Sequence, residues 1–262
     1  MTNFYLDGEP HVDPARLVAH YCDARGFPKE EFGIAPVVLA TFSTQLTAYI
    51  AGLAGGKRLD RWSDWKGDDA FTVGDALTLM TFRIGAPVAV TTLEEAYVCG
   101  MRTLITTGAA GSLQPTAPVG TIVVPSSAIR EEGTSHHYAP QDFEATPDAA
   151  LAAELAEEAA AHGVDVQRGV NWTTDAIYRE HKQKIDLYRR AGVVTVDMEM
   201  SALFTVAAIR DMPCAAIVAV SDELHGDEWD MGFGGEALVR AMTSAARIAL
   251  TVASRRAGIE AP

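Results

Sequence analysis

Several residue types are scarce in this chain, and each scarcity excludes a class of protein. Three cysteines in 262 residues, with no Cys-x-x-Cys pair, indicate neither a disulfide framework nor a zinc site. Basic residues number 21 against 35 acidic ones, and the net charge of −14 disfavours a nucleic acid or an anionic membrane as partner. We therefore expect no metal, and an anionic substrate would need a local basic pocket.

Long apolar runs are also absent. No run reaches the length of a membrane span, and the first residues, MTNFYLDGEPHVDP, lack the charged-then-apolar pattern of a signal peptide. These observations predict a cytoplasmic protein. A hydrophobic content of 48% is enough to bury a full core.

Short segments rich in Val, Ile, Leu and Thr alternate with Ala-rich segments that have helical spacing. Strands are predicted over residues 35–42, 76–82, 86–92, 102–108, 120–129 and 214–222. Helices are predicted over residues 93–100, 146–163, 200–211 and 235–256, the second with Thr146 as N-cap and Pro147 at the first position. This alternation predicts one α/β domain, a three-layer sandwich whose mainly parallel sheet is covered by helices on both faces.

Three further segments have simple structural interpretations. His136 and His137 suggest a metal pair, but neighbours on a strand face opposite ways, which favours structural histidines. Trp62 and Trp65, with two arginines nearby, are typical of a solvated surface. The acidic, glycine-rich stretch 225–235 predicts a mobile loop or lid.

The stretch VVTVDMEMSALFTVAAIRDMPCAAIVAVSDEL, residues 193–224, carries carboxylates into segments that otherwise read as buried. A buried carboxylate is either tightly hydrogen-bonded or used for chemistry. From the residues alone, Glu199 is equally compatible with a helix N-terminus, and Asp222 with the cap of a turn. Asp222 follows a predicted strand, and ligands of parallel sheets gather at the carboxyl ends of strands.

The segment TTGAAGSLQ, Thr106 to Gln114, contains a Gly-x-x-Gly pattern after a buried strand. Such a turn brings the backbone close to a ligand, although glycines that merely shape a tight turn are commoner. Both interpretations stay open on the pattern alone.

TTGAAGSLQPTAPVGTIVVPSSAIREEGTSHHYAP, NWTTDAIYRE and VDMEMSALF…VAVSDEL resemble, in order and spacing, the nucleoside phosphorylase family, which includes uridine phosphorylase, hexameric purine nucleoside phosphorylase and methylthioadenosine nucleosidase. The resemblance runs from about Val37 to Arg256, so residues 1–36 are expected to be an N-terminal extension and 37–262 the family domain. It implies one α/β domain with a central mixed sheet, and cleavage of the bond between ribose C1′ and a nucleobase. It also implies a homo-oligomer, a dimer or a hexamer of dimers, in which neighbours complete each other's sites.

The resemblance implies roles for named residues. Glu199 grips the ribose 2′- and 3′-hydroxyls, and Met198 forms an apolar wall beside the sugar. Asp222 protonates the leaving base, a task that favours a pKa raised by burial. Ile177 and Tyr178 pack on the base, where isoleucine stacks less well than the usual aromatic residue.

Departures from the family pattern concern the nucleophile. Gly108 and Ala109 align with the substrate-binding loop, but Thr106 and Ala109 stand where phosphorylases have an arginine and a hydroxyl residue. Gln45 stands where relatives have a second phosphate arginine, or a water-activating glutamate in nucleosidases, and it cannot act as a base. The chain therefore lacks the residues with which phosphorylases usually bind phosphate, and also the glutamate with which nucleosidases activate water. Inorganic phosphate is the expected co-substrate and no cofactor is expected.

One arginine is a candidate for compensation. Arg83 follows an inner strand at a position where relatives carry a small residue. We hypothesise that it restores positive charge there, with Arg58 or Arg61 of a neighbouring subunit, and the alternative is an arginine pointing to solvent.

Two stretches of the sequence bear on which nucleobase the substrate carries. His181 and Gln183 replace the uracil-recognising Gln and Arg of uridine phosphorylases, and the Ser221–Asp222 pair favours a purine-like base that is protonated on leaving. The sequence thus predicts a nucleoside phosphorylase that releases free base and ribose 1-phosphate. The alternatives are a phosphate-independent nucleosidase and a nucleoside-binding protein without catalysis.

Overall fold

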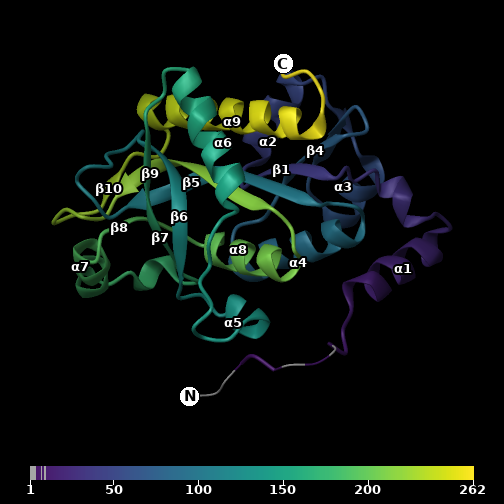
Figure 1. Ribbon diagram of the computed structural model, residues 1–262, viewed down its shortest axis with the longest axis horizontal. Helices are drawn as coiled ribbons and strands as arrows, with labels where there is room; N and C mark the ends of the chain where they lie inside the picture. The colour runs from purple at the N-terminus through teal and green to yellow at the C-terminus, as the bar shows by residue number, and fades with distance from the viewer. Residues whose placement is uncertain (1–3, 7, 9) are drawn as a thin grey trace.

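A computed structural model describes residues 4–6, 8 and 10–262 (Figure 1). Its strands form one sheet in the order β10-β9-β6-β7-β8-β5-β1-β4-β3-β2. Their bounds are β1 (Val37–Thr41), β2 (Lys57–Arg58), β3 (Ala70–Val73), β4 (Leu77–Thr81), β5 (Thr103–Ser112), β6 (Ile122–Arg130), β7 (Val166–Thr173), β8 (Val193–Asp197), β9 (Cys214–Glu223) and β10 (Asp230–Met231).

The sheet branches at β5 and closes on itself. β5 pairs in parallel with β1 and β9 and antiparallel with β8. Because β9 also pairs with β6, β6 with β7 and β7 with β8, these strands and β5 form a closed ring. Strands β1, β4, β3 and β2 extend from β5 as an open half. The predicted mixed α/β sheet is confirmed, with the added feature of closure.

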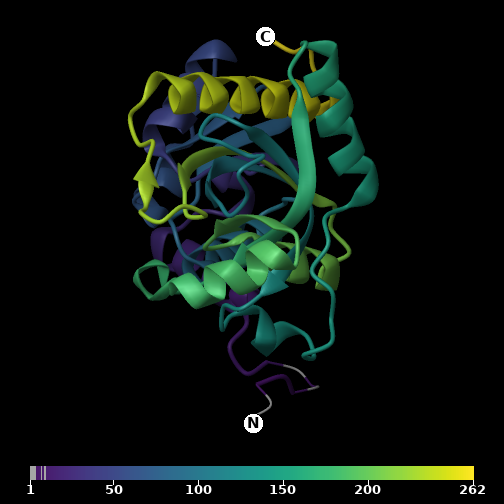
Figure 2. The same ribbon diagram turned by 90° about the vertical axis from the view of Figure 1, so that its left-hand side faces the viewer.

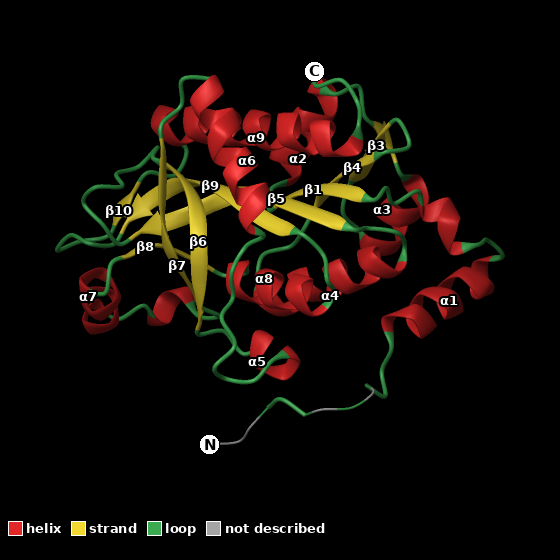
Figure 3. Ribbon diagram, viewed as in Figure 1, coloured by secondary structure: helices red, strands yellow, loops and turns green. Residues whose placement is uncertain are grey.

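Helices cover both faces of the sheet, as predicted (Figures 2 and 3). On one side lie α2 (Thr44–Leu53), α6 (Ala149–Ala161) and α9 (Glu236–Ala257), which share one apolar core with the sheet. On the other side lie α1 (Pro14–Arg25), α4 (Ala86–Val98), α5 (Ser135–Tyr138) and α8 (Met200–Ile209). The remaining elements are α3 (Asp60–Lys66), α7 (Lys182–Arg190), and the 3-10 turns η1 (Lys29–Phe32) and η2 (Ile177–Arg179).

The segment 86–92 is the start of helix α4, so the strand predicted there is wrong. Gly85, with φ of 109°, precedes the helix, and Pro87 lies in its first turn. Buried residues recur at the helical spacing of three and four, as in Ala86, Ala89 and Leu93. Proline in the first turn is the signal that distinguishes this segment from a strand.

Helix α6 starts later than predicted. Asp148, not Thr146, is the N-cap, because its Oδ1 accepts a hydrogen bond from the Leu151 N–H at 2.8 Å. The predicted end is confirmed by Gly163, which follows the helix with φ of +68°.

Trp62 and Trp65 belong to a buried aromatic cluster, so the predicted solvated surface is wrong. Trp62 is 2% exposed, and the Trp65 ring stacks on Phe32 at 5.0 Å. Tyr21 of α1 packs on both Phe32 and Trp65. The cluster ties the segment before β1 to the main body. Arg58 and Arg61 lie at its edge, paired with acidic side chains.

His136 and His137 lie on the short helix α5, not on a strand. His136 Nε2 lies 3.1 Å from the Arg130 carbonyl, and the His137 ring packs on Phe4. No group of three or more metal-binding side chains occurs among the described residues, and none of their helices is long and apolar enough to cross a membrane.

Close packing between the neighbouring strands β7 and β8 gives a stability prediction. A Cβ added at Gly169 would lie 2.3 Å from Val194 Cγ2, and the stiff, branched valine has little freedom to move. We expect Gly169→Ala to destabilise the protein by about 1–3 kcal/mol, lowering Tm by about 2–4 °C per kcal/mol.

The matched control is Gly52→Ala in helix α2, where nothing lies within 4 Å of the added Cβ. That change should raise stability by about 0.5–1 kcal/mol. Thermal unfolding of both variants checks the pair, and equal Tm values would contradict the packing argument.

Candidate active site

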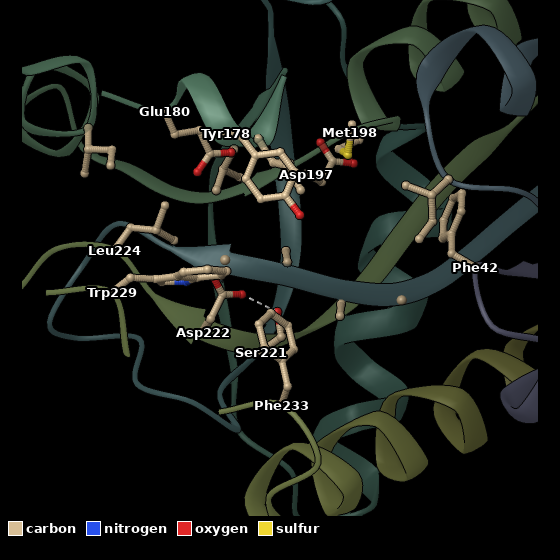
Figure 4. Close-up of a pocket in the computed structure, with 18 of the residues that line it drawn as sticks. Phe42, Tyr178, Glu180, Asp197, Met198, Ser221, Asp222, Leu224, Trp229 and Phe233 are labelled. Atoms are coloured by element: carbon tan, nitrogen blue, oxygen red, sulfur yellow. Dashed lines mark hydrogen bonds between the residues drawn. The ribbon is translucent and has the colours of Figure 1, made fainter. Parts of the chain in front are cut away.

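A cavity of about 730 Å³ lies where β1, β8 and β9 end and β5 passes beneath (Figure 4). This is within the roughly 300–1,000 Å³ of small-molecule pockets. Both Glu199 and Asp222 line it, as does Met198. The sequence-based expectation that the two carboxylates share one cavity therefore agrees with the geometry.

Glu199 is positioned by the junction between β8 and α8. It is the residue immediately before α8, and its side chain is 6% exposed. The Gly85 N–H, at the start of α4, donates a hydrogen bond to Glu199 Oε1 at 2.5 Å. This bond holds one carboxylate oxygen in place, and the side chain lines the cavity.

Asp197 performs the helix-capping task that the sequence left open for Glu199. Its Oδ2 accepts the backbone N–H groups of Glu199 and Met200 at 3.1 and 2.7 Å. Its Oδ1 accepts from Asn171 Nδ2 at 2.6 Å and Thr173 Oγ1 at 2.7 Å. Asp197 therefore fixes the start of α8, and Glu199 is free of that structural duty.

The two carboxyls also interact electrostatically. Burial raises the pKa of both Asp197 and Glu199. Four hydrogen bonds favour the ionised form of Asp197, and its charge adds to the effect of burial in raising the pKa of Glu199. Glu199 is therefore the member of the pair that holds a proton more readily.

A bulge aims Asp222 into the cavity. Along the β5–β9 ladder Ala110 pairs with Val220 and Gly111 with Asp222, so Ser221 is an extra residue on β9. Ser221 Oγ donates to Asp222 Oδ1 at 2.6 Å, and Trp229 Nε1 donates to Oδ2 at 2.7 Å (Figure 4). Since no described backbone N–H donates to this carboxylate, it does not cap a turn.

The segment from Gly108 to Gly111 is strand, not the predicted turn. It lies within β5 and forms part of the cavity wall, together with Ala109. A Cβ at Gly111 would lie 3.2 Å from Asp222 Oδ2 and 2.6 Å from Leu224 Cδ1. The glycines therefore keep a strand surface clear for close approach, rather than shaping a turn.

Of the four residues that the sequence assigned to the base in the stretch from Ile177 to Gln183, two line the cavity and two do not. Ile177 and Tyr178 line the cavity, and Tyr178 is 89% exposed. His181 and Gln183 are exposed and lie outside the cavity lining. Glu180, which sequence reasoning missed, lines the cavity in their place.

Glu180 has an unusual environment. Burial raises its pKa to about 7, and the charges of Asp222 and Glu131 add to the rise, which Lys184 partly opposes. Figure 4 shows Glu180 and Asp222 on opposite sides of the same end of the cavity, with Trp229 near Asp222. Only its place two residues after the Ile-Tyr pair signalled Glu180 in the sequence.

The segment predicted to be a lid, residues 225–235, includes β10, which pairs with the end of β9. It brings Trp229 and Phe233 to the cavity wall. Trp229 is the second functional candidate that sequence reasoning missed. A single tryptophan in an acidic, glycine-rich stretch was the available signal.

Positive charge is sparse around the cavity. Among the described residues that line it, Lys182 is the one basic side chain, and it pairs with Asp227 at 2.9 Å. Arg83 Nε donates to Asp68 Oδ2 at 2.6 Å, outside the lining, although the next residue, Ile84, lines the cavity. Thr106 is buried in β5, and Gln45 is exposed on α2.

Comparisons with known proteins show the family and the fold of this chain. The family model described as "Phosphorylase superfamily" matches residues 67–254. The guanosine phosphorylase of Halorubrum lacusprofundi is 31% identical over 151 residues, 58% of this chain and 63% of that protein. The uridine phosphorylase of Treponema pallidum is 32% identical over 157 residues, 55% of this chain and 60% of that protein. The chain therefore matches slightly less than two thirds of the length of these relatives.

Two solved structures have a similar fold. The purine nucleoside phosphorylase of Toxoplasma gondii, in complex with immucillin-H, has a TM-score of 0.80 at 23% identity, covering 97% of this chain and 99% of that one. The uridine phosphorylase of Vibrio fischeri has a TM-score of 0.75 at 25% identity, covering 86% and 94%.

Proposed function

This chain belongs to the phosphorylase superfamily, and we propose that it cleaves the N-glycosidic bond of a nucleoside with inorganic phosphate. A phosphate oxygen attacks ribose C1′, the bond from C1′ to the base nitrogen breaks, and its electron pair leaves with the base. The products are ribose 1-phosphate and the free base. The named relatives are phosphorylases, which supports this reaction over hydrolysis.

The observation that carries the proposal is the meeting of Glu199 and Asp222 in one cavity. Cleavage passes through an oxocarbenium-like sugar, so positive charge develops on the ribose and negative charge on the departing base. Glu199 binds the ribose hydroxyls beside the reacting carbon. Asp222 delivers a proton to the ring nitrogen of the base as the bond breaks.

We assign a purine-like base to the end of the cavity at Asp222. The apolar surfaces of Trp229 and Leu224 line this end beside the carboxylate (Figure 4). A purine offers there a ring nitrogen that accepts a proton, and a flat face for stacking. Ser221 supports this role because its hydroxyl holds the carboxylate in place.

Phosphate is assigned to the opposite end, beside Glu199. Two helix N-termini adjoin it, because Ser43, the N-cap of α2, lines the cavity, and Gly85, the N-cap of α4, contacts Glu199. Such N-termini favour an anion. Arg83 contributes positive charge nearby, since among the described residues it pairs with one aspartate, Asp68, whereas Arg58 pairs with three.

This assignment predicts the behaviour of Arg83→Ala. The KM for phosphate should rise by about 10-fold or more, while the KM for the nucleoside stays within about twofold, because one charge-assisted contact is lost. Steady-state kinetics at varied phosphate concentration measures both. An unchanged KM for phosphate in this variant would mean that Arg83 points to solvent and does not bind phosphate.

We further propose a cytoplasmic homo-oligomer in which neighbours complete each other's sites. The cavity is open in the single chain, where Tyr178 is 89% and Ile84 is 64% exposed at its rim. Cys22, Cys99 and Cys214 are free and buried, as suits a reducing compartment.

The test is incubation with guanosine, inosine, adenosine, uridine and methylthioadenosine, with and without phosphate, followed by detection of free base and ribose 1-phosphate. Release that requires phosphate supports the proposal. Release without phosphate would assign hydrolysis instead. Ligand-induced stabilisation in thermal shift without any release would assign a nucleoside-binding protein.

A further inference from the structure

The base end of the cavity holds two carboxylates rather than one. Asp222 lies at the end of β9, and Glu180 lies in the loop that follows η2, on the facing side (Figure 4). Asp222 is the acid in the proposed reaction, and Glu180 has no task in it. A half-buried glutamate opposite the catalytic carboxylate needs a separate explanation.

The Glu180 carboxylate is without a hydrogen-bond donor in the described part of the chain. The neighbouring glutamate, Glu131, instead receives both nearby donors: Lys184 Nζ, and the Tyr188 hydroxyl at 2.6 Å. Lys182, the basic residue of the lining, pairs with Asp227. Glu180 thus faces the cavity as an acceptor that no described side chain or backbone group supplies with a hydrogen bond.

Its raised pKa agrees with this placement. Burial, the charge of Asp222 and the charge of Glu131 all favour the protonated form, and Lys184 opposes them. A ligand that offers N–H donors would favour the ionised form and gain a charge-assisted contact. A ligand that offers carbonyl oxygens would place hydrogen-bond acceptors opposite the ionised carboxylate, which cannot donate to them.

The common bases present different edges to such an acceptor. With a ring nitrogen of the imidazole ring at Asp222, the far edge of a purine faces Glu180. Guanine presents there two neighbouring donors, a ring N–H and an exocyclic amine, which match the two oxygens of one carboxylate. Hypoxanthine lacks the amine, adenine has a ring acceptor beside its amine, and uracil flanks its N–H with two carbonyls.

We propose, resting on the proposed function, that Glu180 is a specificity-determining residue that selects a guanine-type base through its paired N–H donors. The ionised carboxylate accepts both donors, while Asp222 faces the opposite edge of the purine. The two carboxylates therefore divide the base between them, one for recognition and one for protonation.

The test compares guanosine with inosine, which differ only in the exocyclic amine. With saturating phosphate, kcat/KM of the wild-type protein should be about 10- to 100-fold higher for guanosine, as for loss of a hydrogen bond to a charged group. In Glu180→Gln the ratio should fall to within about threefold, because the amide presents its own donor to the exocyclic amine.

Glu157→Gln is the matched control, since Glu157 is exposed on α6, away from the cavity. It should keep the wild-type ratio. A guanosine-to-inosine ratio that Glu180→Gln leaves unchanged, or a wild-type protein that prefers inosine, adenosine or uridine, would overturn the inference. Phosphate-dependent cleavage of uridine alone would do so while leaving the proposed phosphorolysis in place.

A binding measurement keeps the two proposals distinguishable. Isothermal titration of guanosine and inosine, without phosphate, should show about 10-fold or greater preference for guanosine in the wild-type protein and its loss in Glu180→Gln. That result would support base selection by Glu180 even in a protein that cleaves neither nucleoside, an outcome that would overturn only the proposed reaction. Equal affinities for both nucleosides in the wild-type protein would contradict the role of Glu180.

Discussion

Asp222→Asn should lower kcat for purine nucleosides by about 10²–10⁴-fold, with nucleoside affinity changed by less than about threefold. An amide cannot deliver a proton to the leaving base. It can preserve the geometry, because its oxygen can accept from the donor-only indole of Trp229, and its NH₂ group can donate to the hydroxyl of Ser221. The interaction lost is therefore one made mainly in the transition state.

The leaving group provides the sharper measurement. A riboside of p-nitrophenol needs no protonation to depart, so Asp222→Asn should cleave it at a rate close to that of the wild-type protein. Asp165→Asn, an exposed change between α6 and β7, is the matched control and should leave both substrates unaffected. Equal losses for purine nucleosides and the nitrophenyl riboside, or a parallel loss of affinity, would remove the general-acid role.

Glu199→Gln should lower kcat/KM by about 10²–10⁴-fold for every nucleoside, whatever its base. The carboxylate is expected to accept from the two ribose hydroxyls, and each charge-assisted bond contributes about 1.5–3 kcal/mol. The amide retains the contact with the Gly85 N–H but loses the charge. Kinetics with ribosides and 2′-deoxyribosides checks the assignment: the variant should no longer distinguish them as the wild-type protein does.

The same change should stabilise the fold at alkaline pH. Because the pKa of Glu199 is raised above that of an unfolded glutamate, the folded chain binds more protons, and its stability falls as pH rises above about 5. Glutamine removes that loss, which reaches up to about 1.4 kcal/mol per pH unit. At pH 8 the variant should melt at least about 2–4 °C above the wild-type protein.

At about pH 5 the two Tm values should converge, because Glu199 is then largely protonated in the folded chain. Differential scanning calorimetry across this range measures the trend. A variant that is less stable at pH 8 would show that the ionised carboxylate stabilises the fold, contrary to the electrostatic argument drawn from Asp197. Loss of activity together with gain of stability is the expected signature of a functional carboxylate.

The sequence predicted the layers of the fold because the strongest signals are long and periodic. Helix α9, with 22 residues and a glycine after its last turn, was recognised almost to the residue. The start of α4 was missed because Ala, Val and Thr in residues 86–92 suit either state when taken alone. Pro87, in the first turn, carried the missing information.

Closure of the ring could not be read from the sequence. β5 continues through Gly108 and Gly111 because β8 and β9 both pair with its second half. Glycine ordinarily weakens or ends a strand. Pairing with strands that are distant in the sequence overrides this preference here, and such pairing leaves no signal in the local sequence. The turn predicted at Gly108 was wrong for that reason.

The candidate site was predicted best where its residues sit on regular elements. Asp222 lies at the end of β9, whose apolar run is clear, and Glu199 comes directly before the Ala-rich helix α8, so both could be expected at an edge of the sheet. Glu180 and Trp229 lie in irregular segments, and nothing in the sequence fixes which residue of such a segment turns inward. His181 and Gln183 were selected from the same stretch, and their exposure shows the limit of alignment within a loop.

This division between strand ends and irregular segments has an evolutionary consequence. Every member of the ring borders two others, so a change near Glu199 or Asp222 disturbs many neighbours at once and is readily purged. Glu180 and Trp229 lie in connecting segments, where a replacement disturbs fewer neighbours. Under the proposed function, this arrangement would let the preference for a base change through a few loop side chains while the two carboxylates at the strand ends stay in place.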